Sequence, residues 1–133
     1  MPAVNAEPHR LHLLRHTKSS WSVPSLDDHD RPLAPRGRRA AAALAEHFGR
    51  GVAIPALVLC SSARRALETL DHVRRGLPSD LPTSIEAGLY GATARTLLER
   101  VRRIPEDTPV ALVVGHNPGL EDLVRGLVGP SHC

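Results

Sequence analysis

The stretch LHLLRHTKSSW, residues 11–21, is an apolar run of strand length that ends abruptly in charged and polar side chains. The stretch VALVVGHNPG, residues 110–119, repeats this pattern, because its apolar run also ends in a histidine. Short apolar runs of this kind are typical of strands buried inside a parallel sheet. In such sheets, ligands bind beyond the carboxyl ends of the strands. The two stretches therefore predict strands that carry polar side chains to one binding site.

Strands and helices alternate along the rest of the chain. We expect strands at residues 10–16, 56–62 and 109–116, a short strand within residues 83–91, and helices at residues 36–51, 63–77, 94–104 and 119–129. This alternation implies right-handed crossovers and a mainly parallel central sheet with helices on both faces. The sequence therefore predicts an α/β protein with three α/β/α layers. The polar segment at residues 17–37 is long for a connection, and long ordered loops are usually functional.

The length of 133 residues fits a single domain, residues 1–133, since domains most often contain roughly 100–150 residues. Aromatic residues are only 2% of the chain, within an apolar share of 41%, so we expect an aliphatic core. The net charge of +3 is scattered among acidic residues rather than gathered in one block. Few aromatic side chains are present to stack on bases, so we expect no nucleic-acid partner.

The sequence shows no targeting or membrane-spanning segment. Residues 1–14, MPAVNAEPHRLHLL, do not have the charge and apolar pattern of a signal peptide, and no apolar run approaches the roughly 18 residues that cross a bilayer. We therefore expect a cytoplasmic protein with no membrane partner. Cys60 and Cys133 are too few for a disulfide framework and are expected to be plain thiols.

Arg15 and His16 lie side by side where the first strand ends. An arginine presents a planar, permanently charged fork of donors that matches phosphate oxygens. A neutral histidine presents a ring nitrogen that can attack phosphorus and form a covalent intermediate, which water then hydrolyses. The pair therefore suits a phosphate-binding catalytic site. A strand end that simply meets solvent is the alternative.

Arg65 and His116 lie at the ends of two other predicted strands. Arg65 comes early in the helix that follows LCSS, where free backbone amides already favour anions. His116 could donate a hydrogen bond to phosphoryl oxygens and stabilise the charge of the transition state, or it could be an ordinary half-buried histidine. Together with Arg15 and His16, the two residues form a coherent phosphoryl-transfer site. That chemistry requires no metal or cofactor, and the chain has no nucleotide-binding P-loop.

Four stretches, LLRHTKSSW, DHDRPLAPRGRRAA, CSSARRALET and LVVGHNPGLEDLV, resemble the histidine phosphatase superfamily, also called phosphoglycerate mutase-like. The resemblance runs from Leu11 to Val128 and is greatest to the SixA-like phosphohistidine phosphatases. It implies a phosphoglycerate mutase-like fold without cofactors. It also implies that His16 is the phosphorylated residue, that Arg15 and Arg65 bind phosphate, and that His116 is the second histidine of the pocket. Thr17 stands where most members have glycine, which favours the SixA-like branch.

Further residues are candidates for substrate contacts. Lys18 and Ser19 follow the Arg-His pair, and Asn117 follows His116. Related enzymes carry an acidic residue in the region of Glu86, so the resemblance suggests that Glu86 assists protonation of the leaving group. A surface position is the other interpretation of Glu86. We expect the segment from Lys18 to Leu33 and the stretch around Tyr90 to determine specificity.

The carboxyl end departs from the resemblance. Similar proteins continue after the last helix with a further strand and helix, whereas this chain stops at GPSHC, residues 129–133. The chain is therefore apparently short at the C-terminus, either naturally or by truncation. We expect an exposed sheet edge there.

Two other groups of residues are weaker candidates, one for a metal site and one for a cysteine nucleophile. The segment from Asp27 to Asp30 contains carboxylates and an imidazole, which bind divalent cations. We interpret it instead as a solvated loop in which Asp30 pairs with Arg31, and we expect no metal site. Cys60 lacks the spacing of a cysteine phosphatase, because Arg64 and Arg65 come too early after it.

The sequence thus predicts a metal-independent phosphatase that acts through a phosphohistidine on His16. Its partner would be a protein that carries phosphohistidine, or a small phosphoester. A phosphoramidate leaving group needs less acid assistance than an alkoxide, which favours the first substrate. The alternative is a binding module that recognises phosphorylated partners without turnover. A mutase is disfavoured, because the chain lacks the insertions of larger members of the family.

Overall fold

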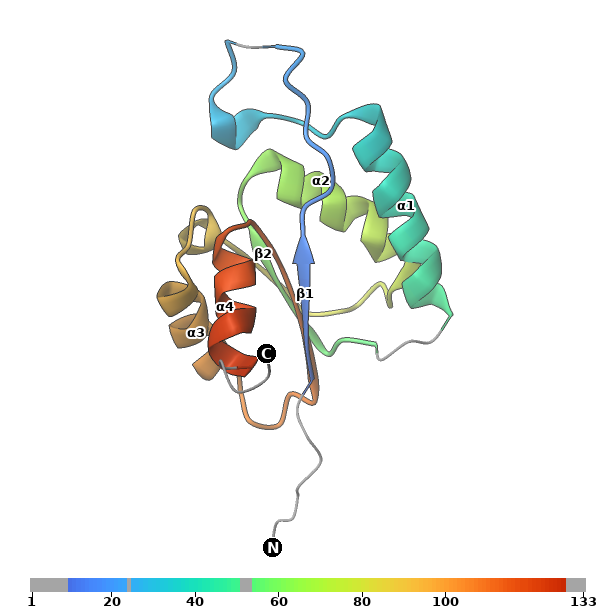
Figure 1. Ribbon diagram of the computed structural model, residues 1–133. Helices are drawn as coiled ribbons and strands as arrows, with labels where there is room; N and C mark the ends of the chain where they lie inside the picture. Colours follow the sequence, from blue (N-terminus) through green and yellow to red (C-terminus); the bar gives the residue numbers. More distant parts are fainter. Residues whose placement is uncertain (1–9, 24, 51–53, 129–133) are drawn as a thin grey trace, which may run out of the picture.

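The computed structural model describes residues 10–23, 25–50 and 54–128 (Figure 1). Its centre is a parallel four-stranded sheet in the order β1-β4-β2-β3. The strands are β1 (Arg10–Arg15), β2 (Leu57–Ser61), β3 (Thr83–Glu86) and β4 (Val110–Gly115). Their parallel arrangement brings all four carboxyl ends to one edge of the sheet. The predicted parallel sheet is thereby confirmed, with β1 and β3 at its two sides.

Helices cover both faces of the sheet (Figure 1). On one face, α1 (Pro35–Gly49) packs against α2 (Arg64–Val73), and on the other α3 (Ala94–Arg102) packs against α4 (Gly119–Val128). Side chains alternate across a strand, so Val58 and Cys60 of β2 join the core under α1 and α2, whereas Leu59 joins the core under α3 and α4. This arrangement confirms the three α/β/α layers.

The core is almost wholly aliphatic, as the composition predicts. Phe48 is the one aromatic side chain among the buried hydrophobic residues described, and leucine, valine and alanine supply most of the others. Leu59, Leu70, Leu112 and Val114 are at most 1% exposed. Burial of a side chain of this size stabilises a fold by about 1.5–3 kcal/mol. The sheet therefore provides a rigid support for the polar residues at its carboxyl edge.

Several elements differ in length from the predicted ones. The third strand ends at Glu86, because residues Ala87–Leu89 form a 3₁₀ turn and Gly91 adopts a φ of 68°. This left-handed conformation is open to glycine without strain, and it turns the chain toward α3. The helix expected to run to residue 77 ends at Val73, and a 3₁₀ turn at Arg74–Gly76 follows. Residues 129–133, on which the expectation of a short C-terminus rests, lie outside the described residues.

The long segment after β1 is held to the domain by backbone pairing. Ser19 and Leu33 form an antiparallel bridge, and the amide of Ala34 donates to the carbonyl oxygen of Lys18 across 2.8 Å. Leu33 is 1% exposed and acts as the apolar anchor of the segment. The predicted functional loop is therefore ordered at its base. None of the helices in the described ranges reaches the length and apolarity that crossing a membrane requires.

Candidate active site

His16 follows β1 directly and is fixed at both ring nitrogens. Its Nδ1 lies 2.7 Å from the carbonyl oxygen of Thr17. A carbonyl oxygen only accepts hydrogen bonds, so Nδ1 carries the proton and Nε2 keeps a lone pair. Arg65 donates from Nε to this Nε2 across 3.1 Å. The structure therefore presents His16 as a neutral imidazole whose Nε2 faces a cation.

A buried threonine supports this geometry from α2. The hydroxyl of Thr69, which is fully buried, donates to the carbonyl oxygen of Arg65 across 2.7 Å. The hydroxyl oxygen of Thr69 also accepts a hydrogen bond from the amide of Thr17 across 3.1 Å. These bonds join Thr17 to α2 through Thr69. They therefore fix His16, the neighbour of Thr17, relative to Arg65.

His116 completes the histidine pair from the end of β4. The ring centroids of His16 and His116 are 5.1 Å apart. The Nε2 of His116 lies 2.7 Å from the Ser61 hydroxyl at the end of β2, and this hydroxyl accepts from the amide of Ala63. Within the described part of the chain, Nδ1 of His116 is buried and has no hydrogen-bond partner. The ends of β1, β2 and β4 therefore converge as the two opening stretches predict.

Both histidines favour the neutral form. The pKa of His16 is lowered mainly by burial and also by the positive charges of Arg65, Arg15 and Arg31, against the opposing effect of the Thr17 hydrogen bond. Burial, followed by the neighbouring His16 and Arg65, lowers the pKa of His116 to about 4. An imidazole must be neutral to act as a nucleophile. At neutral pH, both imidazoles are therefore neutral, and Nε2 of His16 keeps its lone pair.

A cavity of about 530 Å³ opens beside His16. Four cationic residues line it, and no carboxylate is among its described lining residues. These residues are Arg15, His16, Thr17, Lys18, Ser19, Trp21, Arg31, Arg65 and Asn117. A wall of this charge attracts anions. Of the eight predicted site residues, six line this cavity and a seventh, His116, packs against His16.

Glu86 lies elsewhere. Arg100 of α3 donates to both of its carboxylate oxygens across 2.7 and 2.8 Å, and Ser84 donates to one of them. The hydrogen bonds from Arg100 hold the pKa of Glu86 below its usual value, so the carboxyl group stays ionised. Glu86 is not among the described residues that line the cavity. The structure therefore assigns Glu86 to the attachment of α3 to the end of β3.

Two of the predicted substrate contacts have structural partners as well. The side chain of Asn117 accepts from the amide of Glu121 across 3.2 Å and donates to the Glu121 carboxylate, which caps the start of α4. The hydroxyl of buried Ser19 accepts from Arg31 across 2.8 Å. Lys18 is exposed and has no ion pair among the described residues. Of these three, Lys18 is thus the side chain most free to meet a ligand.

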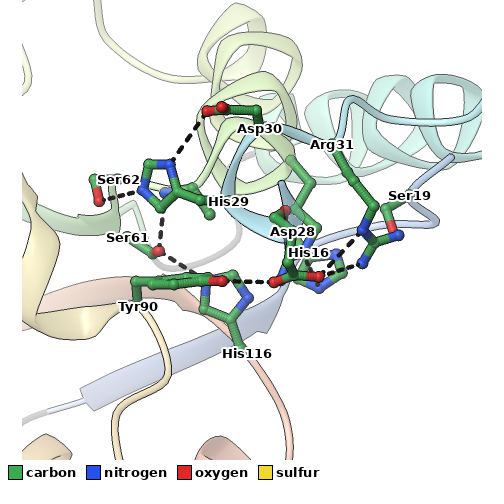
Figure 2. A network of polar contacts seen from close by, with 12 residues as sticks. His16, Ser19, Asp28, His29, Asp30, Arg31, Ser61, Ser62, Tyr90 and His116 are labelled. Carbon is green, nitrogen blue, oxygen red and sulfur yellow. Dashed lines mark hydrogen bonds and ion pairs between the residues drawn. The ribbon is translucent and has the colours of Figure 1, made fainter. Parts of the chain in front are cut away.

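Asp28, for which the sequence predicts no role in the phosphate site, lies in the polar network that Figure 2 shows. Its carboxylate accepts hydrogen bonds from Arg31, Arg65 and Tyr90, and its backbone carbonyl accepts a further one from Arg65. The predicted pairing of Asp30 with Arg31 is wrong, because residues three apart lie on the same side of a 3₁₀ turn, and Asp28 therefore reaches Arg31. Asp30 instead lies 3.5 Å from His29. In the sequence, the only indication of this contact is the three-residue spacing of Asp28 and Arg31.

Tyr90 and His29 belong to the same polar network as Asp28 and His116 (Figure 2). The Tyr90 ring meets His116 and His29 edge to face, with centroid distances of 5.6 and 4.8 Å. His29 is in turn hydrogen-bonded to Ser62 across 2.9 Å. Tyr90 thus contacts the segment of Asp28 and His29 and the end of β4, and the predicted role of its stretch in specificity stays a prediction.

Metal binding and thiol chemistry find no support among the described residues. The structure contains no group of three or more His, Cys, Asp or Glu side chains placed to hold a metal ion within these residues. Cys60 is fully buried under α2, and its thiol donates to the carbonyl oxygen of Ser61. Burial raises the pKa of Cys60 to about 12. A thiolate, the reactive form, is therefore strongly disfavoured at this position.

Residues 11–93 match the family model of the histidine phosphatase superfamily, branch 1. An uncharacterized protein of Mycobacterium tuberculosis is 40% identical over 105 residues, which make up 79% of this chain and 63% of that protein. The chain therefore spans less than two thirds of the length of this relative.

Solved structures show the same fold. A candidate phosphohistidine phosphatase SixA from Agrobacterium tumefaciens superposes with a TM-score of 0.86 at 29% identity, over 96% of this chain and 81% of that one. A second candidate SixA, from Nakamurella multipartitia, gives a TM-score of 0.74 at 32% identity, over 86% of this chain and 62% of that one. The phosphoglycerate mutase-like architecture is thereby confirmed.

Proposed function

Because the chain belongs to the histidine phosphatase superfamily, we propose that it is a metal-independent phosphatase that acts through a phosphohistidine on His16. The observation that carries this proposal is the state of the His16 ring. Its Nδ1–H is bound to the Thr17 carbonyl, and its Nε2 lone pair is directed at the donor of a buried arginine. A phosphoryl group that enters between Nε2 and Arg65 would meet the nucleophile and the charge that stabilises the transition state together.

The reaction would proceed in two displacements. First, Nε2 of His16 attacks phosphorus, the bond to the leaving group breaks with its electron pair, and that group takes up a proton. Water then attacks the phosphorus of the phosphohistidine, the P–N bond breaks, and His16 regains its lone pair as phosphate and a proton are released. Arg15 and Arg65 would hold the phosphoryl oxygens during both steps, since guanidinium forks match these oxygens.

His116 would supply a further donor. The Ser61 hydroxyl accepts from the amide of Ala63, so its own hydrogen is available for Nε2 of His116. The neutral ring then carries its proton on Nδ1, the buried nitrogen that lacks a partner among the described residues. A donor without a competing partner can stabilise a developing negative charge, provided that the phosphoryl group displaces the atoms that cover this buried nitrogen.

The substrate class that this site favours is a phosphoramidate, with phosphohistidine in a protein as the leading case and a small phosphoester as the second. The described lining of the cavity contains no carboxylic acid that would protonate an alkoxide leaving group. An imidazole leaves with less acid assistance than an alkoxide. The cavity of about 530 Å³ is also in the size range of sites that hold a whole ligand, so it has room for a leaving group.

Binding without turnover is the second candidate function. Every nitrogen of Arg65 already has a hydrogen-bond partner in the structure, two of them on Asp28. A phosphoryl group must therefore displace an existing bond before His16 can attack. A module that only holds phosphorylated partners would tolerate this arrangement.

A substrate screen on matched variants separates these possibilities. Wild type, His16→Ala and His47→Ala would be assayed with phosphohistidine, phosphoserine peptides and an aryl phosphate; His47 is exposed on α1 and serves as the control. We expect hydrolysis by wild type and His47→Ala, with the highest kcat/KM on phosphohistidine, and none by His16→Ala. Vanadate binding by wild type without hydrolysis of any substrate would support the binding module instead.

A further inference from the structure

Asp28 joins Arg31 and Arg65, two of the three arginines among the described residues that line the cavity, to the rest of the site. One carboxylate oxygen, Oδ2, accepts from Arg65 Nη2 across 2.9 Å and from the Tyr90 hydroxyl across 2.6 Å. The other, Oδ1, accepts from Nε and Nη2 of Arg31 across 3.1 and 3.0 Å. The backbone carbonyl of Asp28 accepts from Arg65 Nη1 across 2.6 Å. Asp28 is thus bonded to α2, to its own loop and to the segment after β3.

We propose that Asp28 is a positioning residue, which holds the Arg65 guanidinium beside Nε2 of His16, so that a phosphoryl group entering between them meets both groups in place. The inference rests on the proposed function and adds to it a residue that acts through Arg65. Arg65 is 6% exposed, and a buried cation requires hydrogen-bonding partners. Two bonds to Asp28 fix both the position and the plane of the guanidinium. With the plane fixed, the direction of Nε–H is fixed as well.

This arrangement leaves donors for a substrate. A guanidinium has five N–H groups, and the structure uses one each on Nε, Nη1 and Nη2 of Arg65. The second hydrogens of Nη1 and Nη2 are left to bind phosphoryl oxygens. Arginine loses little conformational entropy on binding when its fork is already oriented. Asp28 therefore prepares Arg65 for the phosphoryl group and does not use up its capacity.

The same carboxylate also holds Arg31, a second residue that lines the cavity. Arg31 is 6% exposed, donates to Ser19 and places its guanidinium carbon 3.4 Å from the centroid of the Trp21 ring. Ser19, Trp21 and Arg31 all line the cavity. Because Asp28 holds Arg31 through a second oxygen, its loss is expected to disturb substrate binding as well as the geometry of His16.

Asp28 is not suited to be the proton donor of the reaction. Hydrogen bonds from Tyr90, Arg65 and Arg31 hold the pKa of Asp28 far below its usual value. A carboxylate that stays ionised at every pH of interest cannot donate a proton. Its effect on the reaction must therefore pass through the groups that it orients.

A competing interpretation is that Asp28 blocks the site by occupying Arg65. The two interpretations predict opposite signs. If Asp28 competes with substrate, Asp28→Asn frees Arg65 and tightens the binding of phosphate or vanadate. If Asp28 positions Arg65, the same change weakens binding, because an asparagine presents one amide group that cannot accept from an arginine.

The kinetic test uses Asp28→Asn, Asp28→Glu, Tyr90→Phe and the matched control Asp27→Asn. The control removes the same charge one position away on an exposed side chain, so it measures the long-range effect of charge alone. We expect kcat to fall about 100-fold in Asp28→Asn, the cost of a misplaced catalytic group, with weaker vanadate binding. Asp28→Glu should restore part of kcat and Tyr90→Phe should lose less, whereas Asp27→Asn should stay within about twofold of wild type.

Two further measurements show whether Asp28 acts through Arg65. In an Arg65→Ala background, Asp28→Asn should cause a smaller loss of vanadate affinity than it causes in wild type, since residues that act as a unit are not additive and only the effect through Arg31 remains. The ¹⁵N chemical shifts of the His16 ring should show Nδ1 protonated in wild type, Asp27→Asn and Asp28→Asn, because the Thr17 carbonyl holds that proton, whereas the Nε2 shift should change in Asp28→Asn alone, as the Arg65 donor moves.

The outcomes distinguish this proposal from the proposed function. Unchanged kcat and unchanged His16 shifts in folded Asp28→Asn would overturn the positioning role and leave the phosphatase intact. Tighter vanadate binding in Asp28→Asn would overturn it in favour of a block. A wild type that hydrolyses nothing would contradict the proposed function, and the His16 shifts would still support or overturn the role of Asp28.

Discussion

Arg65 donates from Nε to Nε2 of His16 across 3.1 Å, although 49 residues separate them in the chain. One residue follows a strand and the other begins a helix, and the parallel sheet brings both to the same edge. The contact places a buried cation at the nitrogen that carries a lone pair. It is the geometric basis for assigning nucleophile and phosphate-binding group to these two residues.

The guanidinium geometry of Arg65 yields the first prediction. Arg65→Lys keeps the charge but loses the planar fork that reaches His16 and Asp28 together. We expect kcat/KM to fall about 100-fold in steady-state assays. The matched change Arg64→Lys, at an exposed position paired with Glu68, should leave kcat/KM within about twofold. Equal losses in the two variants would show that charge alone matters.

The lowered pKa of His16 predicts how activity depends on pH. The folded pKa lies below 6.5, so His16 is neutral and active at pH 7 and loses its nucleophilic lone pair only as pH falls through that lowered value. The acid limb of kcat/KM should therefore lie below pH 6.5. An acid limb above pH 6.5 in a pH–rate profile would contradict a buried, neutral His16.

His116 predicts a stability change in the same pH range. Its pKa is 6.5 in an unfolded chain and about 4 in the fold, so the unfolded state binds more protons between these values. The free energy of unfolding should then fall as pH drops from 6.5 to 4 and should not change through His116 above pH 6.5. His116→Gln should flatten this part of the curve, measured by urea unfolding. A wild-type curve that is flat there would argue against a buried His116.

A side chain added at Gly37 of α1 should clash with the loop that carries Lys18. A Cβ at Gly37 would lie 2.1 Å from the Lys18 carbonyl oxygen, which accepts from Ala34. Gly37→Ala should therefore cost about 1–3 kcal/mol of stability and move the loop. Gly126→Ala is the control, because a Cβ there meets nothing within 4 Å, and it should stabilise α4 by about 0.5–1 kcal/mol. Thermal unfolding of both variants tests the difference.

We expect that Cys60 takes no part in catalysis. It is 0% exposed and its pKa is raised to about 12. Cys60→Ala should therefore keep the kcat of wild type while lowering the unfolding temperature through the lost packing. Loss of turnover in a folded Cys60→Ala protein would reopen thiol catalysis.

The sequence predicts the sheet and the convergence at its edge for a physical reason. Apolar runs such as residues 11–14 and 110–114 are typical of strands buried inside a parallel sheet, and the carboxyl ends of parallel strands lie on the same side of the sheet. The positions of His16, Arg65 and His116 follow from that rule. The hydrogen bonds that decide their chemistry do not, because they join side chains from distant segments.

The sequence does not predict which arginine Asp28 and Glu86 each contact. Both are carboxylates near glycine-rich or polar segments, and their charge alone does not distinguish them. The 3₁₀ turn brings Asp28 to Arg65 and Tyr90, whereas Arg100 of α3 binds Glu86. Which arginine each acid meets depends on how far a strand or a turn extends. That length is set by local backbone geometry, which the pattern of apolar residues does not report.

The phosphohistidine on His16 is the central claim, and trapping it is the most direct test. Wild type and His16→Ala would be mixed with a ³²P-labelled phosphoramidate and quenched within milliseconds in alkali, and the bound label would then be exposed to acid. The account predicts label on wild type that is stable in alkali and released by acid, with none on His16→Ala. Turnover by His16→Ala at the wild-type rate, or equal labelling of both proteins, would contradict it.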